Sequence, residues 1–465
     1  MSPTVRTRRA TTVALATDAL LPAPGRRVLL SPFDVYWAAL PPVRRVFLFA
    51  PPSPPVDIAD IARELRSSLA ALLPAFHPFA GELVYDPESS RLAIVCDEGA
   101  GVAFVEAETE LDFARLVEDG AEHDVDALQQ LVPDIRREEL PAPVMAVQVT
   151  EFVGGTGGMA VGVALHHTAA DGRGLWRFLE MWATAAAAGI RGLPVTEETS
   201  LQLHDRSLAH FDGDVELAGL FLRQTVPELP RTVPKEGPPA GVRTHLSRRT
   251  FTLRASAVRR LKQQLCSEGG TVKAPSTFAA VVAHGWVSIA GASGFFTDGG
   301  PVFATFLADI RAHMSPPVPE SYIGNCLALC TVSLSGTELA GADGLSRACV
   351  AIREAVAEVR RDPLRDRSRW FTKFADIPRG RAVIIAGSPW FPTNAVDFGF
   401  GMPARAELAS MNHDGEMVLV AGREVGSVQA SVALAADKMP AFHELFLTHG
   451  TSNLELVFSP STSRA

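Results

Sequence analysis

The sequence predicts an α/β fold with two lobes of similar size, and three observations support this expectation. Apolar runs of strand length alternate with amphipathic segments of helical length along the chain, which is the pattern of α/β proteins. The 465 residues, of which 47% are hydrophobic and 20% charged, can fill more than one substantial core. The periodicity weakens and prolines accumulate at about residues 189–245, which indicates a crossover between an N-terminal lobe (1–205) and a C-terminal lobe (206–465).

Strands and one long helix are predicted in the first part of the N-terminal lobe. The segment 45–50 is continuously apolar, as expected of a strand that is buried on both faces. Apolar residues recur at helical spacing at Ile58, Ile61 and Leu65, which predicts a helix over 56–73. A first strand at about 11–16, a turn at FHPFAGEL and a strand at RLAIVCD complete this part.

Two further strands, 144–153 and 159–165, are separated by the glycine-rich stretch GGTGG. Such a glycine cluster can cradle a nucleotide phosphate when a helix follows it. Here a strand follows it, so the stretch is predicted to be the turn of a β-hairpin.

The C-terminal lobe is predicted to alternate strands and helices in the same way. Ser256 is predicted to cap a helix at 257–266, because serine is a favoured residue at helix starts. The other expected elements are a helix at about 215–224, a strand at RRTFTL, a helix that starts near Ser276, strands at VFATFLADIR and CLALCTVSL, a helix at 346–360, a strand at RAVIIAG, a hairpin of MVLVAG and SVQASVAL, and a closing helix at 439–447.

The overall charge and the cysteine content exclude several classes of function and location. A net charge of −9 argues against binding to nucleic acid or to an anionic membrane surface. The apolar segment 278–296 is interrupted by His284 and glycines, so it is expected to be a buried core helix and not a membrane span. Cys326 and Cys330 have no second cysteine pair that would complete a metal site, and we expect them to be buried and inert.

An odd number of cysteines, five in all, favours a reducing compartment, and the cytosol is the expected location. The Arg- and Thr-rich N-terminus could mimic an organelle transit peptide, but a short tail before the first strand is the favoured interpretation. We expect a monomer.

The stretch HHTAADG is the strongest candidate for a reactive site. The strand 159–165 delivers His166 and His167 to its carboxyl end, Asp171 follows, and an alanine-rich helix begins at once. A histidine has an ordinary pKa of about 6.5 and is well suited to take a proton at neutral pH. By spacing alone, a structural His–Asp pair, a metal site or a hydrolase remain alternatives, although no third metal ligand is grouped nearby.

Read together with DFGFG at residues 397–401, HHTAADG resembles the plant BAHD acyl-CoA-dependent acyltransferases. Their two marks are H-x-x-x-D-G in the middle of the chain and D-F-G-W-G near its end. The segments SPFDVYW, FHPFAGEL, LHDRSL, KAPSTFAAVVAHGW, ADIRAHMSPPVPESYIGNC and AGSPWFPTNAVDFGFGMP agree along nearly the whole length. YIGNC is similar to the signature of the branch that acylates flavonoid and anthocyanin glucosides. Two residues depart from the pattern, namely Phe400 for Trp and Asn394 for Tyr.

The resemblance implies a fold and roles for individual residues. The fold is that of chloramphenicol acetyltransferase-like enzymes, with a channel between two lobes. His167 would be the general base, and Asp171 would point away from the substrate and pair with Arg311. The remaining residues of the two motifs, which are Gly172, Asp397, Gly399 and Gly401, would be structural.

Contacts with the acyl donor are expected from helix termini and arginines. Ser276 and Thr277 lie at a predicted helix N-terminus, whose free N–H groups suit a CoA phosphate, and Lys273 adds charge nearby. Arg177, one turn after Arg173, could bind a malonyl carboxylate with its fork of donors.

The reaction that the resemblance implies is transfer of an acyl group, with malonyl favoured, from acyl-CoA to a hydroxyl of a phenolic or flavonoid glucoside. Acyl-CoA is then a co-substrate, and no metal, bound cofactor or covalent intermediate is required. The alternatives are a peptide-synthetase condensation domain, a hydroxycinnamoyl-CoA transferase with an acid or amine acceptor, and a catalytically inactive protein that binds acyl-CoA or phenolics.

Overall fold

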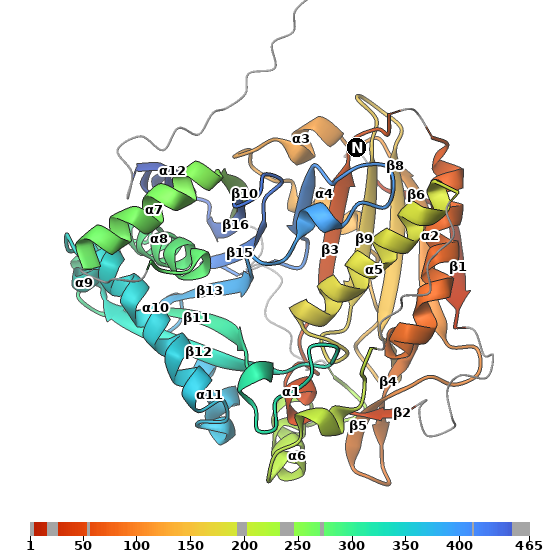
Figure 1. Ribbon diagram of the computed structural model, residues 1–465, viewed down its shortest axis with the longest axis horizontal. Coiled ribbons are helices and arrows are strands. Elements are labelled where there is room, and N and C mark those ends of the chain that lie inside the picture. Colours follow the sequence, from red (N-terminus) through yellow and green to blue (C-terminus); the bar gives the residue numbers. More distant parts are fainter. Residues whose placement is uncertain are drawn as a thin grey trace, which may run out of the picture.

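The protein consists of two lobes, each built around a six-stranded sheet, in the computed structural model (Figure 1). The structure describes residues 4–15, 27–53, 56–192, 202–232, 246–269, 274–411 and 413–448. Lys273 and part of the predicted crossover lie outside these residues. The expected α/β architecture is confirmed.

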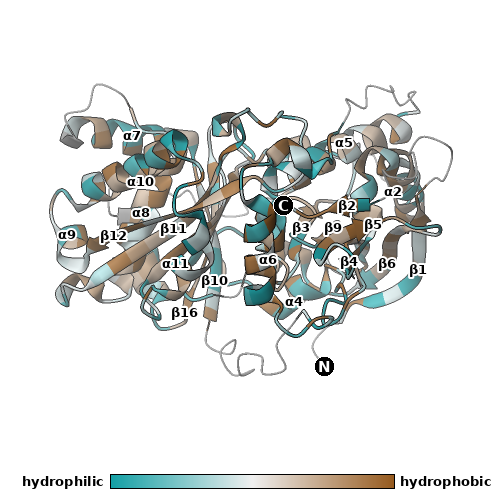
Figure 2. Ribbon diagram, turned by 90° about the horizontal axis from the view of Figure 1, so that it is seen from below, coloured by the Kyte–Doolittle hydropathy of each residue, from teal (hydrophilic) through white to brown (hydrophobic). Residues whose placement is uncertain are grey.

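The first sheet has the strand order β1-β6-β8-β9-β3-β14. Its outer edge strand carries Arg6, Arg8 and Arg9 and is hydrophilic in Figure 2, and charges of this kind keep an exposed sheet edge from pairing with other chains. The strands in this order are β1 (Arg6–Ala14), β6 (Gly101–Thr109), β8 (Met145–Phe152), β9 (Met159–Leu165), β3 (Val43–Phe49) and β14 (Arg405–Leu408).

Helices cover both faces of the first sheet. The long helices α2 (Ile58–Leu72) and α5 (Gly172–Ile190) pack on one face, where Trp182 of α5 donates a hydrogen bond to the carbonyl of Leu65 at 3.1 Å (Figure 1). The short helices α3 (Phe113–Val117) and α4 (Val125–Gln130) bury their apolar residues against the opposite face. Since both faces are covered, every residue of β9 is buried.

A small sheet of order β2-β5-β4-β7 closes the lower end of the first lobe, together with short helices (Figure 1). Its strands are β2 (Arg27–Leu29), β5 (Arg91–Val95), β4 (Glu82–Asp86) and β7 (Ala142–Pro143). The helices here are α1 (Pro32–Val35), the 3₁₀ helices η2 (Leu73–Ala80) and η3 (Arg206–Ala209), and α6 (Asp214–Thr225).

The second sheet has the order β10-β16-β15-β13-β11-β12 and is covered by helices on one face. Its strands are β10 (Leu246–Leu253), β16 (Val428–Ala435), β15 (Glu416–Ala421), β13 (Ala382–Gly387), β11 (Pro301–Asp309) and β12 (Leu327–Ser335). The helices of this lobe are α7 (Ala255–Gly269), α8 (Thr277–Ala292), α9 (Gly336–Ala340), α10 (Gly344–Arg361), α11 (Trp370–Ala375) and α12 (Met439–Thr448), with 3₁₀ helices η5 (Phe295–Thr297), η6 (Arg311–His313), η7 (Arg367–Arg369) and η8 (Thr393–Ala395).

The two lobes exchange segments. The short strand β14 comes late in the chain, yet it pairs with β3 at the edge of the first sheet. Residues from the predicted C-terminal lobe, among them Phe221, Tyr322 and Phe398, also belong to the core cluster of the first lobe. The division into lobes between residues 205 and 206 stays a prediction. The structure shows in addition that segments after residue 205 pack into the first lobe.

Most predicted elements are found, and two local expectations are wrong. The hairpin of GGTGG forms, because β8 and β9 pair as antiparallel neighbours. The turn predicted at FHPFAGEL is instead the 3₁₀ helix η2, because Pro78 fits a tight helical turn whose neighbouring aromatic residues are buried. The α7 helix starts at Ala255, so Ser256 lies inside it and does not cap it.

In the part of the chain that the structure describes, no helix is long and apolar enough to cross a membrane. The predicted core helix at 278–296 corresponds to α8, whose residues from Ala279 to Ala290 are buried.

Candidate active site

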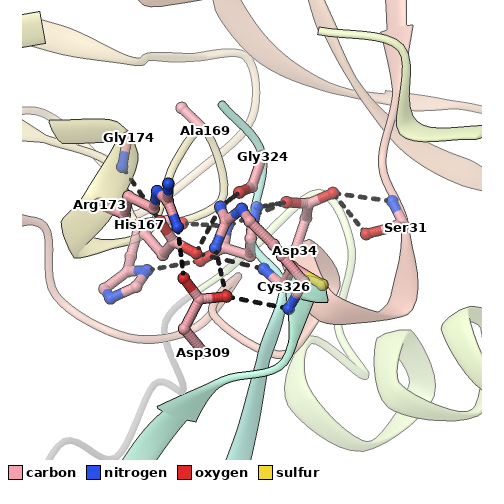
Figure 3. A network of polar contacts seen from close by, with 12 residues as sticks. Ser31, Asp34, His167, Ala169, Arg173, Gly174, Asp309, Gly324 and Cys326 are labelled. Atoms are coloured by element: carbon pink, nitrogen blue, oxygen red, sulfur yellow. Dashed lines mark hydrogen bonds and ion pairs between the residues drawn. The ribbon is translucent and has the colours of Figure 1, made fainter. Parts of the chain in front are cut away.

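His167 lies two residues after the end of β9, between the two lobes, and is half-buried (Figure 3). The indole ring of Trp37 stacks on its imidazole with a centroid distance of 3.9 Å and an angle of 15° between the planes. This stacking fixes the plane of the imidazole ring.

The tautomer of His167 follows from its contact with Asn325, 3.1 Å from Nδ1. The amide nitrogen of Asn325 donates to the carbonyl of His167 at 2.8 Å and to Asp34 at 2.9 Å, so its oxygen is the atom that faces the ring. An oxygen can only accept, and therefore Nδ1 of His167 carries the proton. The lone pair is left on Nε2, for which the described residues supply no hydrogen-bond partner.

Asp34 holds this arrangement in place from the first lobe (Figure 3). It is fully buried, and one of its carboxylate oxygens accepts from both the backbone and the side chain of Asn325. The other oxygen accepts from Ser31 and from Arg206, whose guanidinium also donates to the carbonyl of Ala169 at 2.8 Å. Four segments far apart in the sequence are thereby joined around His167.

Asp171 does not face the same way as His167. Its carboxylate caps α5 by accepting from the backbone of Gly174 at 3.1 Å, and it accepts from the backbone of Cys326 at 3.2 Å. The predicted ion pair with Arg311 is confirmed, with 2.8 Å between Nη2 and Oδ2 and both side chains buried. Arg311 also donates to the carbonyl of Gly324 at 2.6 Å, so this pair ties the YIGNC segment to the start of α5.

Burial sets the protonation states of the site. It lowers the pKa of His167, although the nearby Asp171, Asn325 and Asp34 act in the opposite direction, so the imidazole is neutral at pH 7. Burial also lowers the pKa of His166 to about 3. The pKa of the Cys326 thiol is raised, mainly by burial, so this cysteine stays protonated and is a poor nucleophile.

Gly172, the first residue of α5, is required by close packing. A Cβ at this position would lie 2.5 Å from Cζ of Phe391, whose ring stacks on Trp176 of the same helix. A side chain at position 172 would therefore collide with this ring, and the structural role expected for Gly172 stays a prediction.

The DFGFG loop lies far from His167 along α5. Oδ1 of Asp397 accepts from the backbones of Gly399 and Gly401 at 2.8 and 2.9 Å, and both glycines have left-handed backbone angles, with φ of 104° and 111°. Gly399 packs on Ala187, fifteen residues after Gly172, which is about 22 Å along a helix. The loop therefore contributes to packing and does not contact the imidazole.

The aromatic residues of DFGFG pack inside the first lobe. The ring of Phe400 contacts Phe49 at 4.9 Å between centroids, and Phe398 contacts Trp182 at the same distance. Phenylalanine at position 400 thus retains an aromatic contact.

Of the residues considered as donor contacts, Arg173 joins this network through Asp309, which also pairs with Arg311 (Figure 3), whereas Ser276 and Thr277 do not join it. Ser276 caps α8 by accepting from the backbone of Ala279 at 3.1 Å, and Ser276 and Thr277 are joined to His167 by no hydrogen bond among the described residues. Arg177 is exposed on α5, one turn from Glu180. Arg173 forms ion pairs with Asp309 and Glu320.

The most informative residues that the sequence did not identify are Asn325, Asp34, Arg206 and Trp37. All four stand in segments on which the family resemblance depends, namely YIGNC, SPFDVYW and LHDRSL. No role was predicted for them, because their function depends on contacts across more than a hundred residues of sequence.

Comparisons with known proteins identify the family and the fold of the chain. A family model described as "Transferase family" matches residues 8–448. The chain is 29% identical over 443 residues to phenolic glucoside malonyltransferase 1 of Bemisia tabaci, covering 90% of this chain and 92% of the relative. It is 28% identical over 456 residues to malonyl-coenzyme:anthocyanin 5-O-glucoside-6'''-O-malonyltransferase of Salvia splendens, covering 94% and 95%. The crystal structure of vinorine synthase superposes with a TM-score of 0.71 at 19% identity, covering 94% of this chain and 96% of that chain.

Proposed function

Because the chain belongs to the BAHD transferase family and is an acyl-CoA-dependent acyltransferase, we propose that it transfers a malonyl group to a hydroxyl of a phenolic or flavonoid glucoside. The observation that carries the proposed transfer to a hydroxyl is the fixed tautomer of His167, with the proton on Nδ1 and the lone pair on Nε2. A base of this kind is suited to deprotonate an alcohol.

In the proposed reaction, Nε2 of His167 takes the proton of the acceptor hydroxyl while the hydroxyl oxygen attacks the carbonyl carbon of the thioester. A C–O bond forms, the C–S bond breaks, and the imidazolium returns its proton to the sulfur that leaves as the thiol of CoA. Hydrogen bonding from Nδ1 to Asn325 stabilises the imidazolium that forms in between. The proposed step requires no nucleophile from the protein, and the thiol of Cys326 is buried and protonated.

The choice of donor and acceptor rests on the relatives, whose names specify malonyl transfer to phenolic and anthocyanin glucosides. A panel of malonyl-, acetyl- and coumaroyl-CoA against glucosylated and unglucosylated phenolics, with product masses, tests it. We expect a mass increase of one malonyl group on the glucosides and little product on the aglycones. Transfer of coumaroyl to an amine or acid acceptor would instead support the hydroxycinnamoyl alternative, and no turnover with any donor would support a binding protein.

Asn325→Ala is expected to lower kcat by about 10- to 100-fold, since the imidazole then loses the acceptor that fixes its tautomer. As the pH is lowered, kcat/KM of the native protein should fall with a midpoint below pH 6.5. The reason is that burial lowers the pKa of His167, and only the neutral imidazole can take a proton. The contact with Asn325 raises that pKa, so its loss should move the midpoint to still lower pH. The pH dependence of kcat/KM measures both effects.

Ser31→Ala is the matched control, because Ser31 also donates to Asp34 but does not contact His167. It should keep the pH profile of the native protein. A midpoint that rises in Asn325→Ala would contradict the assigned tautomer.

Arg177→Ala tests the proposed carboxylate contact of the donor. If Arg177 binds the malonyl carboxylate, KM should rise about tenfold or more for malonyl-CoA, with little change for acetyl-CoA. Arg173→Ala is the natural comparison, since Arg173 lies one turn earlier on α5 and is paired with Asp309. Equal losses with both donors would remove Arg177 from donor recognition.

The contacts of CoA with Ser276, Thr277 and Lys273, the cytosolic location and the monomeric state stay predictions. The helix N-terminus at Ser276 supports the first of these, because α8 has 16 residues and its first N–H groups are near the surface.

A further inference from the structure

Trp37 lies two residues after the end of α1, one turn beyond Asp34. The backbone N–H of Trp37 donates to the carbonyl of Asp34 at 3.1 Å, so the chain continues in a helical turn and the two side chains share one side of it. Asp34 acts on the edge of the His167 ring through Asn325, whereas Trp37 covers the face of that ring. One turn of chain therefore supplies two of the groups that surround the imidazole.

The indole of Trp37 is held in position by aromatic neighbours. Tyr36 and Trp37 pack edge to face with 4.9 Å between ring centroids, and Tyr36 packs in the same way on Phe221 of α6 at 5.9 Å. Phe33 of α1 contacts Phe211 at 5.6 Å, and α1 lies beside α6 in Figure 1. The indole is therefore part of a packed cluster and keeps a defined orientation.

The geometry of the stack suits a charged imidazole better than a neutral one. The ring centroids of Trp37 and His167 are 3.9 Å apart, and the ring planes differ by 15°. Two neutral aromatic rings usually keep about 4.5–7 Å between centroids and avoid lying directly face to face, because the negative faces of their π-systems repel each other. A cation is instead attracted to the face of an aromatic ring, and most strongly to that of an indole. The protonated imidazole is therefore the form that this stack favours.

The two carboxylates nearest to His167 are already balanced by buried guanidinium groups. Asp171 pairs with Arg311 at 2.8 Å, and Asp34 pairs with Arg206 at 3.1 Å. Burial lowers the pKa of His167, and the two carboxylates oppose this shift without overcoming it. Because each negative charge is matched by a positive one, an imidazolium gains little net attraction from either ion pair.

The other titratable groups around His167 add no compensating charge. His166 is buried, and burial lowers its pKa to about 3, so it is neutral at pH 7. Burial also raises the pKa of the Cys326 thiol, which stays protonated. Arg173 and Asp309 pair with each other at 3.2 Å. The indole face is thus a source of stabilisation for the imidazolium that these groups do not provide.

We propose that Trp37 stabilises the protonated form of His167 by a cation–π contact across the two stacked rings. Trp37 is then a positioning residue, which acts on the acceptor hydroxyl only through the base. The step that it assists is the transfer of the hydroxyl proton to Nε2, in which the ring gains its positive charge. This inference rests on the proposed role of His167, but the contact itself is present in the free protein and can be measured without substrate.

Titration of the histidines, followed by nuclear magnetic resonance, measures the contact in the free protein. The Cε1–H signal of His167 is identified by its absence in His167→Gln, and its titration midpoint gives the pKa. Without the indole the imidazolium is less stable and loses its proton at lower pH, so the midpoint in Trp37→Leu should fall by about 0.5 to 1 pH unit. Trp37→Phe is the matched comparison, because phenylalanine is close to leucine in size but keeps a π face. Its midpoint should lie between the other two, and equal midpoints in Trp37→Phe and Trp37→Leu would overturn the proposal.

Fluorinated tryptophan tests the same contact with almost unchanged packing. Fluorine on the six-membered ring of the indole withdraws electron density from its face and weakens the attraction for a cation, while the shape of the side chain is nearly kept. As fluorines are added one by one, the midpoint of His167 should fall stepwise in the native protein and stay constant in Trp37→Phe. Equal shifts in the two proteins, or no shift in either, would count against the contact. This comparison decides the matter even if Trp37→Leu fails to fold.

Reaction rates separate this inference from the proposed function. With malonyl-CoA and a phenolic glucoside, kcat of Trp37→Leu should be about 3- to 30-fold below that of the native protein, and Trp37→Phe should recover part of the loss. If the native protein transfers no acyl group and its His167 midpoint still responds to fluorination, the proposed function fails and the contact stands. If acyl transfer is found and the midpoint does not respond, the contact fails alone.

Discussion

Replacing His167 by alanine is expected to lower kcat by about 10²- to 10⁴-fold, which is the usual contribution of a general base. The proposed role as base accounts for this loss, because Nδ1 is held as a donor to Asn325 and Nε2 keeps the lone pair that can take a proton. Stacking on Trp37 keeps the ring in the plane that this role requires. Steady-state rates with malonyl-CoA and a phenolic glucoside measure the effect, and KM for the donor should change little.

His210→Ala provides the control for this variant. His210 is a histidine of the same lobe with a side chain that is 60% exposed, and its partner is Asp214. It should retain full activity. If His167→Ala keeps activity within tenfold of the native protein, with an unchanged melting temperature, then His167 does not act as the base.

Replacing Asp171 by alanine is expected to destabilise the protein by about 3–5 kcal/mol, which is the typical cost of removing one partner from a buried ion pair. Arg311 would remain buried without its carboxylate, and α5 would lose its N-cap. Burial alone would lower the pKa of Arg311, yet Asp171 and Asp309 outweigh it and raise this pKa, so the arginine cannot escape by losing its proton. Denaturant or thermal unfolding measures the change, and activity should fall with it.

Asp57→Ala is the control that shows how much stability is lost when a helix loses only its N-cap and no buried ion pair is broken. Asp57 caps α2 by accepting from the backbone of Ala59 at 2.8 Å, and its loss should cost only about 1 kcal/mol. Restoring charge balance with Asp171→Ala and Arg311→Met together should recover part of the loss. An Asp171→Ala protein that melts like the native one but has lost activity would contradict the structural role.

Local patterns in the sequence were sufficient to predict the core of the site. The strand that ends at Leu165, the polar junction and the helix α5 are neighbours in the chain, so their arrangement follows from hydrophobic periodicity. The pairing of Asp171 with Arg311 could be predicted only from the family resemblance, because 140 residues separate the two in the sequence. It is confirmed by the structure.

The remaining parts of the site depend on contacts that no local pattern encodes. In the sequence Asn325 cannot be distinguished from an ordinary polar loop residue. Only the fold shows that its amide lies between Asp34 and His167. The strand β14 has only four residues and is made by its pairing with β3, so its sequence alone gives little signal. The same exchange brings Glu407 of that strand into contact with Arg248 of the second sheet.

The pairing of β14 with β3 also constrains how the protein folds during its synthesis, because β14 is near the end of the chain. As the chain leaves the ribosome, β3 presents an unpaired edge until nearly the whole polypeptide has been synthesised. A truncated product that ends at the crossover would keep this edge open and would be prone to pair with other nascent chains. The two lobes are therefore not modules that recombination could exchange one at a time.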